Sequence, residues 1–510
     1  MSRLFIGIDS GTQSTRVLAV DGDTARIAAE HATPYGVLPS DVPGTKEQDP
    51  AMWVDAAAAG MTAVLSCGGV RPADVAAIGI SGQQHGFVPL DEANRVIRPA
   101  KLWCDTSTAR EAEELVRRIG GLERTIAIIG TGIPAGFTAS KVLWLKEHEP
   151  ANYARLASIL LPHDYLAFWL TGTKVMEWGD GSGTALMDVR TRTWAPDVLA
   201  AIDEGLAAKL PALIHPRTPV GVVKPDLARR WGLRPDVVVT GSGDNMMGAI
   251  GTGNVREGIV TASLGTSGTI YACTERAVID PRGEIAAFCD ATGRWLPLAC
   301  TMNVTVATEL VCRLFGLDHD GLTRAAAETP PGADGLVLVP FLEGERTPNV
   351  PEGTGVWIGA RERTLTVGHM ARAAIEGVTL GLNYGLNRMR DLGLSPTEVR
   401  LTGGGARNPL WRQIAADVFA CPVACPSVRE GAAFGAALHA QWAWEHTFGS
   451  GVDIGDLTDR AIGVDNAMRA EPRAGAVRTY AALQGVFDDT AACLPPAFAR
   501  HRRFITAGVR

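Results

Sequence analysis

The sequence predicts an α/β protein made of two similar domains. The chain of 510 residues has 46% hydrophobic and 20% charged side chains, so at roughly 100 to 200 residues per domain it can bury at least two cores. A strand, a Gly-Thr turn and a second strand occur near the start of the chain and again near its middle. Around these segments, short β-branched runs alternate with helical stretches, which is typical of parallel or mixed sheets covered by helices.

The two Gly-Thr turns indicate a duplication. Residues 4–20 and 259–271 each have two apolar runs joined by a small polar turn, which is the pattern of a β-hairpin. Their glycines, Gly11 and Gly265, lie 254 positions apart (265 minus 11), almost half of the chain. A self-similarity at this offset predicts two related α/β domains.

A Gly-Thr turn is also suited to binding phosphate. Without a Cβ atom, its backbone N–H groups can approach phosphate oxygens, and Thr and Ser hydroxyls add donors. A single turn of this kind is more often an ordinary hairpin, but a pair at half the chain length predicts two turns that bracket one ligand. We place the boundary near residues 251–258, with one domain over 1–250 and the other over 251–510.

Further apolar runs predict the remaining framework of the two domains. Strands are expected at 75–80, 237–240, 336–340 and 399–402. Residues 372–389 carry apolar side chains at steps of three and four residues, which predicts a helix with one face in the core.

The charge and cysteine content exclude several classes of protein. The 55 acidic and 48 basic side chains are spread along the chain and give a net charge of -7, so we expect no nucleic-acid partner. No stretch reaches 18 uninterrupted apolar residues, and the first twenty residues include Asp9 and Arg16, so neither a membrane span nor a signal peptide is expected. Nine cysteines without paired spacing favour reduced thiols and a cytoplasmic location.

Two polar segments directly follow predicted strands. Ligands of open α/β sheets lie beyond the carboxyl ends of strands. Gln84 and His85 follow the strand at 75–80, and their amide and imidazole groups suit sugar hydroxyls, although a lone histidine is as often structural. Asp244 follows the strand at 237–240 between glycines and Asn245, where it can face a substrate or cap the next helix.

A third segment, residues 403–408, is a run of three glycines, Ala, Arg and Asn after the strand at 399–402. Asn408 fits the N-cap of a helix and Pro409 its first residue. Three consecutive glycines cost chain entropy, so the close approach of a nucleotide explains them better than a simple turn. The Walker spacing GxxxxGK[ST] does not occur, so a P-loop kinase is not expected.

With these motifs in hand, the sequence resembles the FGGY carbohydrate kinases, and within that family the xylulose kinases. The resemblance covers nearly the whole chain through the segments 7–12, 82–86, 102–105, 141–145, 161–165, 243–245, 263–268, 344–348 and 403–407. It implies two actin-like ATPase domains of the ribonuclease H-like fold with a nucleotide and sugar cleft between them. The N-terminal domain would bind the sugar and the C-terminal domain the nucleotide.

The resemblance also implies the chemistry and its residues. The expected reaction is the transfer of a phosphoryl group from ATP, with Mg²⁺, to a hydroxyl of a ketopentose, D-xylulose in the first place, with Asp244 as the catalytic base. The sugar would be bound by Gln84, His85, Trp103, Asp105, Asp244 and Asn245. ATP would be bound by Thr12, Gln13, Arg16, Gly265, Thr266, Gly404, Gly405 and Asn408, and Asp9 would orient the hydrated magnesium. We expect a homodimer, although no motif addresses the assembly.

Departures from the family pattern keep other substrates open. Many bacterial xylulose kinases have Met where this chain has Gln84, and an Asn with a nearby Arg around Asp105, where this chain has Cys104 before the aspartate. Ala360 stands where a larger aliphatic residue is usual in the second family signature. The alternatives are therefore an FGGY kinase for ribulose, glycerol or another polyol and, more distantly, a non-kinase nucleotide switch of the actin and chaperone type.

Overall fold

The computed structural model describes residues 3–428, 431–449 and 451–507, and these form two compact units. The first unit contains the described residues of 1–256, 273–296 and 430–463. The second contains those of 257–272, 297–429 and 464–510. The second half of the chain thus contributes two segments to the first compact unit. The division into domains over 1–250 and 251–510 stays a prediction.

A six-stranded sheet forms the first unit, in the order β13-β14-β5-β1-β2-β3. Its strands are β1 (Leu4–Ser10), β2 (Ser14–Asp21), β3 (Ile27–Pro34), β5 (Val75–Gly82), β13 (Gly221–Val222) and β14 (Val238–Gly243). Strand β1 is antiparallel to β2 and parallel to β5, which is in turn parallel to β14. The first predicted hairpin and the strands at 75–80 and 237–240 are thus confirmed.

Six strands of a seven-stranded sheet repeat this pattern in the second unit, in the order β18-β16-β15-β21-β22-β23. Their bounds are β15 (Ile259–Leu264), β16 (Gly268–Ala272), β18 (Trp295–Thr301), β21 (Glu398–Thr402), β22 (Val423–Pro426) and β23 (Val464–Ala470). Strand β15 is antiparallel to β16 and parallel to β21, which is parallel to β22. Because each pairing direction matches that of β1, β2, β5 and β14, the duplication predicted from the two Gly-Thr turns is present in the topology.

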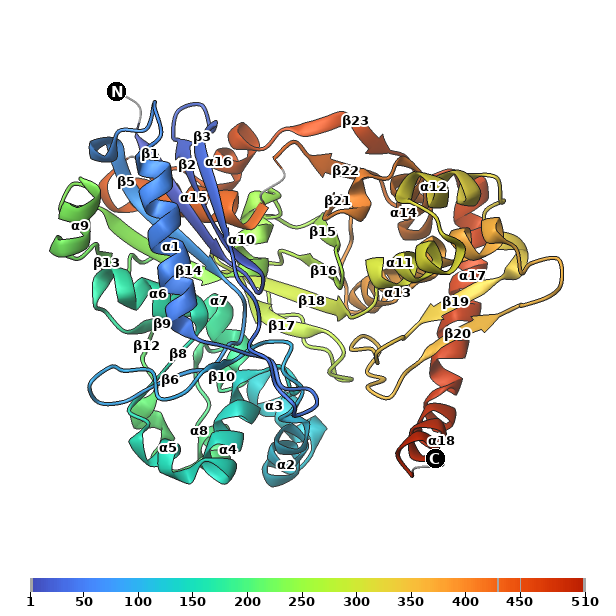
Figure 1. Ribbon diagram of the computed structural model, residues 1–510, viewed down its shortest axis with the longest axis horizontal. Helices are drawn as coiled ribbons and strands as arrows, with labels where there is room; N and C mark the ends of the chain where they lie inside the picture. The colour runs from blue at the N-terminus through green and yellow to red at the C-terminus, as the bar shows by residue number, and fades with distance from the viewer. Residues whose placement is uncertain (1–2, 429–430, 450, 508–510) are drawn as a thin grey trace. The chain divides into compact units, whose positions relative to one another are not determined.

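Helices cover these sheets. In the first unit α1 (Pro50–Leu65) and α6 (Pro162–Thr171) pack together on one side, and α10 (Asp244–Gly251) packs against α15 (Gly431–Phe448) (Figure 1). In the second unit α13 (Val367–Asp391) packs against α11 (Thr305–Phe315), α12 (His319–Ala327) and α14 (Pro409–Phe419). Helix α13 confirms the helix expected over 372–389, and its predicted apolar face is buried.

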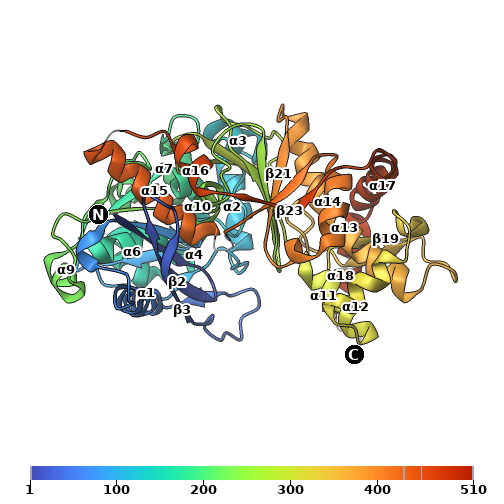
Figure 2. The same ribbon diagram turned by 90° about the horizontal axis from the view of Figure 1, so that it is seen from above.

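Small residues explain why α15 belongs to the first unit although it follows residue 430. A Cβ atom on Gly7 of β1 would lie 1.9 Å from the Ala433 carbonyl oxygen, and one on Gly79 of β5 would lie 1.9 Å from that of Ala436. A Cβ atom on Gly435 would lie 1.8 Å from the backbone oxygen of Met247 in α10. Helix α15 thus lies directly on the backbones of two strands and of α10 (Figure 2).

Further strands and helices complete both units. The first unit also has β4 (Glu47–Gln48), β6 (Val88–Leu90), β7 (Ala100–Lys101), β8 (Ser158–Leu160), β9 (Val175–Glu177), β10 (Met187–Asp188), β11 (Thr193–Trp194), β12 (Ala212–Ile214), β17 (Ala286–Cys289), α2 (Ala109–Ile119), α3 (Leu122–Ile129), α4 (Thr138–His148), α5 (Pro150–Arg155), α7 (Trp178–Gly181), α8 (Pro196–Ile202), α9 (Pro225–Trp231) and α16 (Ile454–Ala461). The second also has β19 (Val337–Pro340), β20 (Gly355–Ile358), α17 (Ala474–Cys493) and α18 (Pro495–Thr506). Strand β19 confirms the strand expected at 336–340.

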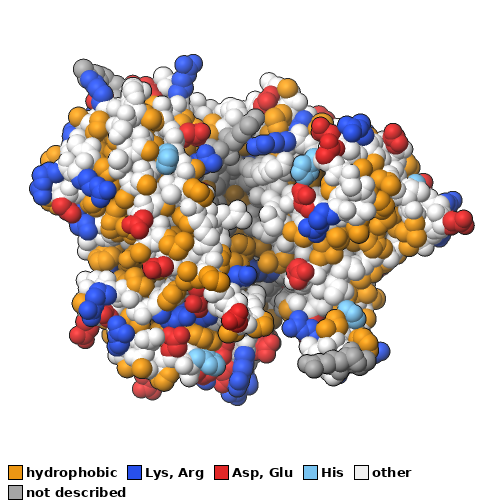
Figure 3. Space-filling view, viewed as in Figure 1, with side chains coloured by type: hydrophobic (Ala, Val, Ile, Leu, Met, Phe, Trp, Pro, Cys, Tyr) orange, Lys and Arg blue, Asp and Glu red, His pale blue; other side chains and the backbone are white. Residues whose placement is uncertain are grey.

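The surface carries both signs of charge. On the face seen in Figure 3, Lys and Arg are interspersed with Asp and Glu rather than gathered by sign. Among the described residues, no helix combines the length and the hydropathy that a bilayer span requires.

Candidate functional site

The carboxyl ends of β1, β5 and β14 lie at one edge of the first sheet and bring two aspartates to that edge. Asp9 lies near the end of β1 and accepts a hydrogen bond from the Ser81 hydroxyl at 2.7 Å. Asp244 begins α10, where its Oδ1 atom accepts bonds from the backbone N–H of Asn245 at 2.8 Å and from the Asn245 side chain at 3.1 Å. Gly243 occupies the N-cap of α10, so the alternative that Asp244 serves as the cap is wrong.

The surroundings of Asp244 disfavour its negative charge. Burial raises the pKa of this carboxyl to about 8, and the charges of Asp9 and Asp180 add to the shift. A general base works best with a pKa near the operating pH, so Asp244 is suited to accepting a proton. The mutual repulsion of these carboxylates also favours a cation beside them.

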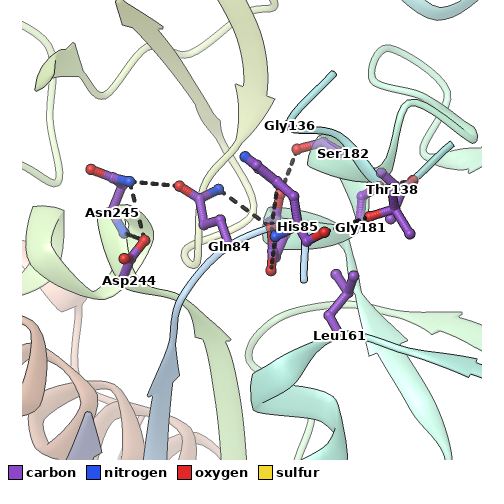
Figure 4. A network of polar contacts seen from close by, with 12 residues as sticks. Gln84, His85, Gly136, Thr138, Leu161, Gly181, Ser182, Asp244 and Asn245 are labelled. Carbon is purple, nitrogen blue, oxygen red and sulfur yellow. Dashed lines mark hydrogen bonds and ion pairs between the residues drawn. The ribbon is translucent and has the colours of Figure 1, made fainter. Parts of the chain in front are cut away.

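Three of the predicted sugar-binding side chains, Gln84, His85 and Asn245, form one network with Asp244 (Figure 4). The Asn245 amide donates to Gln84 Oε1 at 2.7 Å, and the Gln84 amide donates to Asp180 Oδ1 at 3.4 Å. The His85 Nδ1 atom lies 3.0 Å from the same Asp180 oxygen. The structure therefore brings Gln84, His85, Asp244 and Asn245 together, and Asp180 links Gln84 to His85.

The backbone of His85 is held in an unusual conformation. Its φ of 60° lies in the left-handed region, which costs about 1–3 kcal/mol for a residue other than glycine. Its N–H donates to Asp180, 3.3 Å from each carboxylate oxygen. Its carbonyl accepts bonds from the Thr138 hydroxyl at 3.1 Å and from Lys141 Nζ at 2.7 Å. These contacts from α4 and α7 fix the direction of the imidazole.

Asp180 is a site residue that the sequence interpretation missed. It is fully buried, and His163 Nδ1 lies 3.5 Å from its Oδ2 atom. Burial alone would raise the pKa of Asp180, but the contacts with His163 and His85 lower it well below its usual range. The available signal was an aspartate between glycines in residues 179–183, a composition that leaves space around a carboxylate, although no predicted strand precedes it.

Behind Asp180 lies a further group of buried ionisable side chains. His163 Nε2 is 2.9 Å from Asp164 Oδ1 and 3.6 Å from Glu177 Oε1. Burial opposes the charge of His163, but Asp164 and Asp180 outweigh it and raise the pKa of this histidine. Burial raises the pKa of Glu177 to about 7. The raised pKa of His163 and the lowered pKa of Asp180 both favour an ion pair between these two buried side chains.

The Gly-Thr turn of the first unit is fixed by its neighbours. The Thr12 hydroxyl donates to Gln83 Oε1 at 3.1 Å and accepts a bond from the Trp103 indole N–H at 3.0 Å. Gln48 Nε2 donates to the Thr12 carbonyl at 2.7 Å. Trp103 and Thr12, assigned to sugar and ATP respectively, are therefore direct neighbours.

Asp105 has a different environment from the other predicted sugar ligands. It is fully buried, and its Oδ2 atom accepts bonds from the Lys46 backbone at 2.8 Å and from Lys101 Nζ at 3.3 Å. Its Oδ1 atom accepts bonds from the N–H and hydroxyl of Ser107 at 3.0 and 2.6 Å. These bonds make Asp105 the anchor of its loop and leave it little capacity to bind a sugar. The contact of Asp105 with the sugar stays a prediction.

Two further predicted ATP residues lie on the first hairpin. Arg16 stands directly opposite Asp9 in the register of β1 and β2, and its Nη1 atom lies 3.5 Å from Glu30. Gln13 lies in the turn and is exposed. Both positions are compatible with a ligand at the turn, and their contact with ATP stays a prediction.

The matching turn of the second unit is held through its carbonyl groups. Those of Gly265 and Thr266 accept bonds from the backbone N–H groups of Thr305 and Val304, each at 3.0 Å. The Thr266 side chain is exposed. The carbonyl groups of this turn are thus hydrogen-bonded to the start of α11, and the side chain of Thr266 lies at the surface.

The three glycines after β21 are present for different reasons. Gly403 has a φ of 84°, and a Cβ atom on it would lie 2.7 Å from the Leu264 backbone. A Cβ atom on Gly405 would lie 2.9 Å from the Leu264 side chain, whereas one on Gly404 would meet nothing within 4 Å. Packing on β15 therefore accounts for Gly403 and Gly405, and only Gly404 has the open space that the nucleotide explanation requires.

Asn408 is the N-cap of α14, as predicted. Its Oδ1 atom accepts bonds from the N–H groups of Leu410 and Trp411, and its Nδ2 atom donates to the Thr323 hydroxyl at 2.9 Å. The side chain is thus occupied in holding α14 against α12. A contact of Asn408 with adenosine stays a prediction.

Comparison of the sequence with models of known protein families identifies the class of protein. The model for the FGGY family of carbohydrate kinases, N-terminal domain, matches residues 4–251, and the model for the C-terminal domain of that family matches residues 260–444. The chain therefore belongs to the FGGY family of carbohydrate kinases. The resemblance and the expected fold class are confirmed, and the alternative of a non-kinase nucleotide switch is wrong.

Similar proteins with curated names narrow the class. The xylulose kinase of Haemophilus influenzae is 38% identical over 484 residues, which cover 94% of this chain and 97% of that protein. The xylulose kinase of Streptomyces coelicolor is 40% identical over 441 residues, which cover 86% of this chain and 87% of that protein. Both are similar over nearly their whole length.

Solved structures show the same fold. The crystal structure of a xyloylose kinase from Brucella ovis superposes with a TM-score of 0.88 at 30% identity and covers 96% of this chain and 99% of its own. A gluconate kinase from Lactobacillus acidophilus reaches a TM-score of 0.89 at 22% identity, covering 98% and 100%. Because a kinase named for another sugar superposes equally well, the fold alone does not identify the acceptor.

Proposed function

We propose that this protein phosphorylates D-xylulose with ATP and Mg²⁺ and releases D-xylulose 5-phosphate and ADP. The observation that carries the proposal is a network that starts at Asp244, whose pKa is about 8. It runs through the amides of Asn245 and Gln84 to Asp180 and the imidazole of His85. Curated relatives named xylulose kinase at 38% and 40% identity support this sugar. Another FGGY substrate, such as ribulose or glycerol, is the alternative.

In the proposed mechanism, Asp244 accepts the proton of the sugar hydroxyl as its oxygen attacks the γ-phosphorus. The new oxygen–phosphorus bond forms while the bond from this phosphorus to the bridging oxygen of ADP breaks. Gln84, His85 and Asn245 would orient the sugar by hydrogen bonds to its hydroxyl groups. General-base catalysis of this kind contributes about 10²- to 10⁴-fold.

The residues around Asp244 suit a magnesium ion. Asp9 raises the pKa of Asp244, so two carboxylates repel each other at the place where a cation is expected. Mg²⁺ binds few carboxylates and keeps several water molecules, which fits Asp9 as the residue that orients it. When bound with ATP, the ion supplies positive charge that offsets the charge developing on the phosphoryl oxygens.

The assignment of ATP rests on the two Gly-Thr turns and Gly404. Thr12, Gly265 and Thr266 would lie along the phosphates, and Gly404 would lie beside the adenosine. The cytoplasmic location and the homodimer remain predictions from the sequence.

A substrate panel tests the proposed sugar. ADP release is measured with D-xylulose, D-ribulose, L-ribulose, glycerol and D-gluconate at equal concentrations. We expect kcat/KM to be highest for D-xylulose. A higher value for another acceptor would replace the sugar and leave the kinase class intact.

Replacing Asp180 with Asn tests the role of this buried carboxylate as a positioning residue. Asn retains one acceptor oxygen but removes the charge that holds His85 and Gln84. A small displacement of these two side chains should lower kcat/KM for the sugar about 10- to 100-fold. Asp180 also raises the pKa of Asp244, so its loss should lower that pKa. The acid limb of the pH profile of kcat/KM should then move to lower pH.

A buried aspartate elsewhere in the first unit provides the control. Asp280 accepts hydrogen bonds from the backbone N–H groups of Arg282, Glu284 and Ile285. Asp280→Asn should therefore affect stability without shifting the pH profile of kcat/KM. An unchanged acid limb in Asp180→Asn would reject the coupling between Asp180 and Asp244.

Gly404→Val tests the nucleotide position. Gly404 has helical dihedral angles, with φ of -64° and ψ of -40°, and its Cβ direction is open, so the variant should fold normally. If adenosine lies there, KM for ATP should rise several-fold while KM for the sugar stays unchanged. Equal KM values for ATP in both proteins would place the nucleotide elsewhere.

A further inference from the structure

Helices α2 and α4 bring together three side chains that the phosphoryl-transfer site does not use. Glu111 lies in the first turn of α2, and Glu147 and His148 end α4. One possible ligand atom from each, a carboxylate oxygen or a ring nitrogen, lies within 4.8 Å of the others. The two helices pack directly on each other in the first unit (Figure 1).

The Glu111 carboxylate is the unusual member of this group. Only 3% of the residue is exposed, and its Oε1 atom lies 2.9 Å from His148 Nε2. Its buried Oε2 atom has no hydrogen-bond partner. A buried carboxylate oxygen without a partner is costly, so a cation bound by this carboxylate would stabilise it.

The other two groups can complete a coordination site. The His148 ring stacks on Trp144, with centroids 5.4 Å apart, which restricts the orientation of the imidazole. Glu147 Oε1 accepts a bond from Arg118 Nη2 at 2.6 Å, and a carboxylate has two oxygens, so it can bind both an arginine and an ion. Two carboxylates and an imidazole are a donor set typical of zinc and its neighbours in the transition series.

The surrounding charges permit a cation. The surface hollow at this place is lined by four glutamates and three arginines, Arg110, Glu111, Glu113, Glu114, Arg117, Arg118 and Glu147. Bonds from Arg117 and Arg118 hold the pKa of Glu114 at about 2, so this carboxylate stays ionised and balances part of the arginine charge. The negative charges therefore exceed the positive ones around the candidate ligands.

We propose that Glu111, Glu147 and His148 form a binding site for one divalent transition-metal ion of the zinc class. Water would complete the coordination, as in zinc sites with three protein ligands. The ion would tie the start of α2 to the end of α4. Since α4 begins at Thr138, which bonds to the His85 carbonyl, the expected effect is to stabilise the helical layer that supports His85.

Metal titration of the full-length, tag-free protein tests this site. The protein is treated with a chelator and titrated with Zn²⁺ against a chromophoric indicator, with Mg²⁺ in excess to occupy the magnesium site proposed at Asp9. We expect about one Zn²⁺ per chain, a visible absorption spectrum with Co²⁺ in its place, and a higher melting temperature in the presence of the ion. Each of these three signals should be lost in His148→Gln and in Glu111→Gln.

The control is an exposed histidine with a glutamate neighbour but no buried carboxylate. His319 Nε2 lies 3.5 Å from Glu309 Oε1, and His319→Gln should bind Zn²⁺ like the unmodified protein. His148→Gln changes an exposed side chain and should fold even if Glu111→Gln does not. If the unmodified protein binds no Zn²⁺, or if His148→Gln retains the full stoichiometry, the group is only a histidine–glutamate ion pair and the proposal is wrong.

Discussion

Replacing Asp244 with Asn should lower kcat by about 10²- to 10⁴-fold, the contribution of a general base. The amide has nearly the same size and still accepts a hydrogen bond from Asn245, so KM for the sugar should change little. Steady-state kinetics with coupled ADP release measures both quantities. If the variant retains more than about a tenth of the turnover, Asp244 is not the base.

The same variant should be more stable than the unmodified protein at pH 8 and above. The pKa of Asp244 is about 8 in the folded protein, well above the ordinary value for Asp. Between these two values the folded state holds a proton that the unfolded state releases, so the free energy of unfolding falls as the pH rises through this range. The Asn variant lacks this fall in the free energy of unfolding. Thermal unfolding of both proteins at several pH values measures the difference.

An aspartate in a capping role serves as the control for both effects. Asp453 is the N-cap of α16 and accepts the N–H groups of Gly455 and Asp456. Because Asn caps helices about as well as Asp, Asp453→Asn should leave turnover and the pH dependence of stability unchanged.

Gly79→Ala should cause a large loss of stability. Its new methyl group would lie 1.9 Å from the carbonyl oxygen of Ala436 and 2.6 Å from the carbonyl carbon, both backbone atoms of α15 that cannot rotate away. Overpacking a core costs about 1–3 kcal/mol and occasionally more, and we expect the upper end because α15 is held equally closely at Gly7 and Gly435. Urea unfolding monitored by circular dichroism gives the change in free energy.

A glycine with free space around it is the matched control. Gly485 lies inside α17, and a Cβ atom on it would meet nothing within 4 Å. Gly485→Ala should stabilise the protein by about 0.5–1 kcal/mol, because alanine loses less conformational freedom in a helix. If Gly79→Ala unfolds at the same urea concentration as the unmodified protein, the close packing of α15 on β5 does not hold.

Local patterns predicted the central strands of both sheets and helix α13. The hairpins β1–β2 and β15–β16, the strands β5, β14, β19 and β21 and the helix α13 all follow from apolar periodicity and turn residues. The N-cap role of Asn408 also follows from its position before Pro409. These features depend on residues close together in the chain, so one sequence is sufficient to predict them.

Features that depend on distant residues could not be predicted in this way. Helix α15 joins the first unit because Gly7 and Gly79 leave space for it, and neither glycine differs in its local pattern from an ordinary strand residue. Asp180 reaches Gln84 and His85 across almost one hundred positions. A Cβ atom on Gly403 or Gly405 would meet Leu264 of a neighbouring strand, a contact that the local sequence pattern does not reveal.

The return of α15 to the first unit has a consequence for synthesis on the ribosome. Translation proceeds at about 5–20 residues per second. The sheet face above Gly7 and Gly79 therefore stays uncovered until residues 431–448 have been synthesised, which is most of the elongation time. During this interval the nascent first unit exposes the face of the sheet that α15 later buries. A prematurely terminated product without that helix should therefore be a target for chaperones and proteases rather than a free-standing sugar-binding fragment.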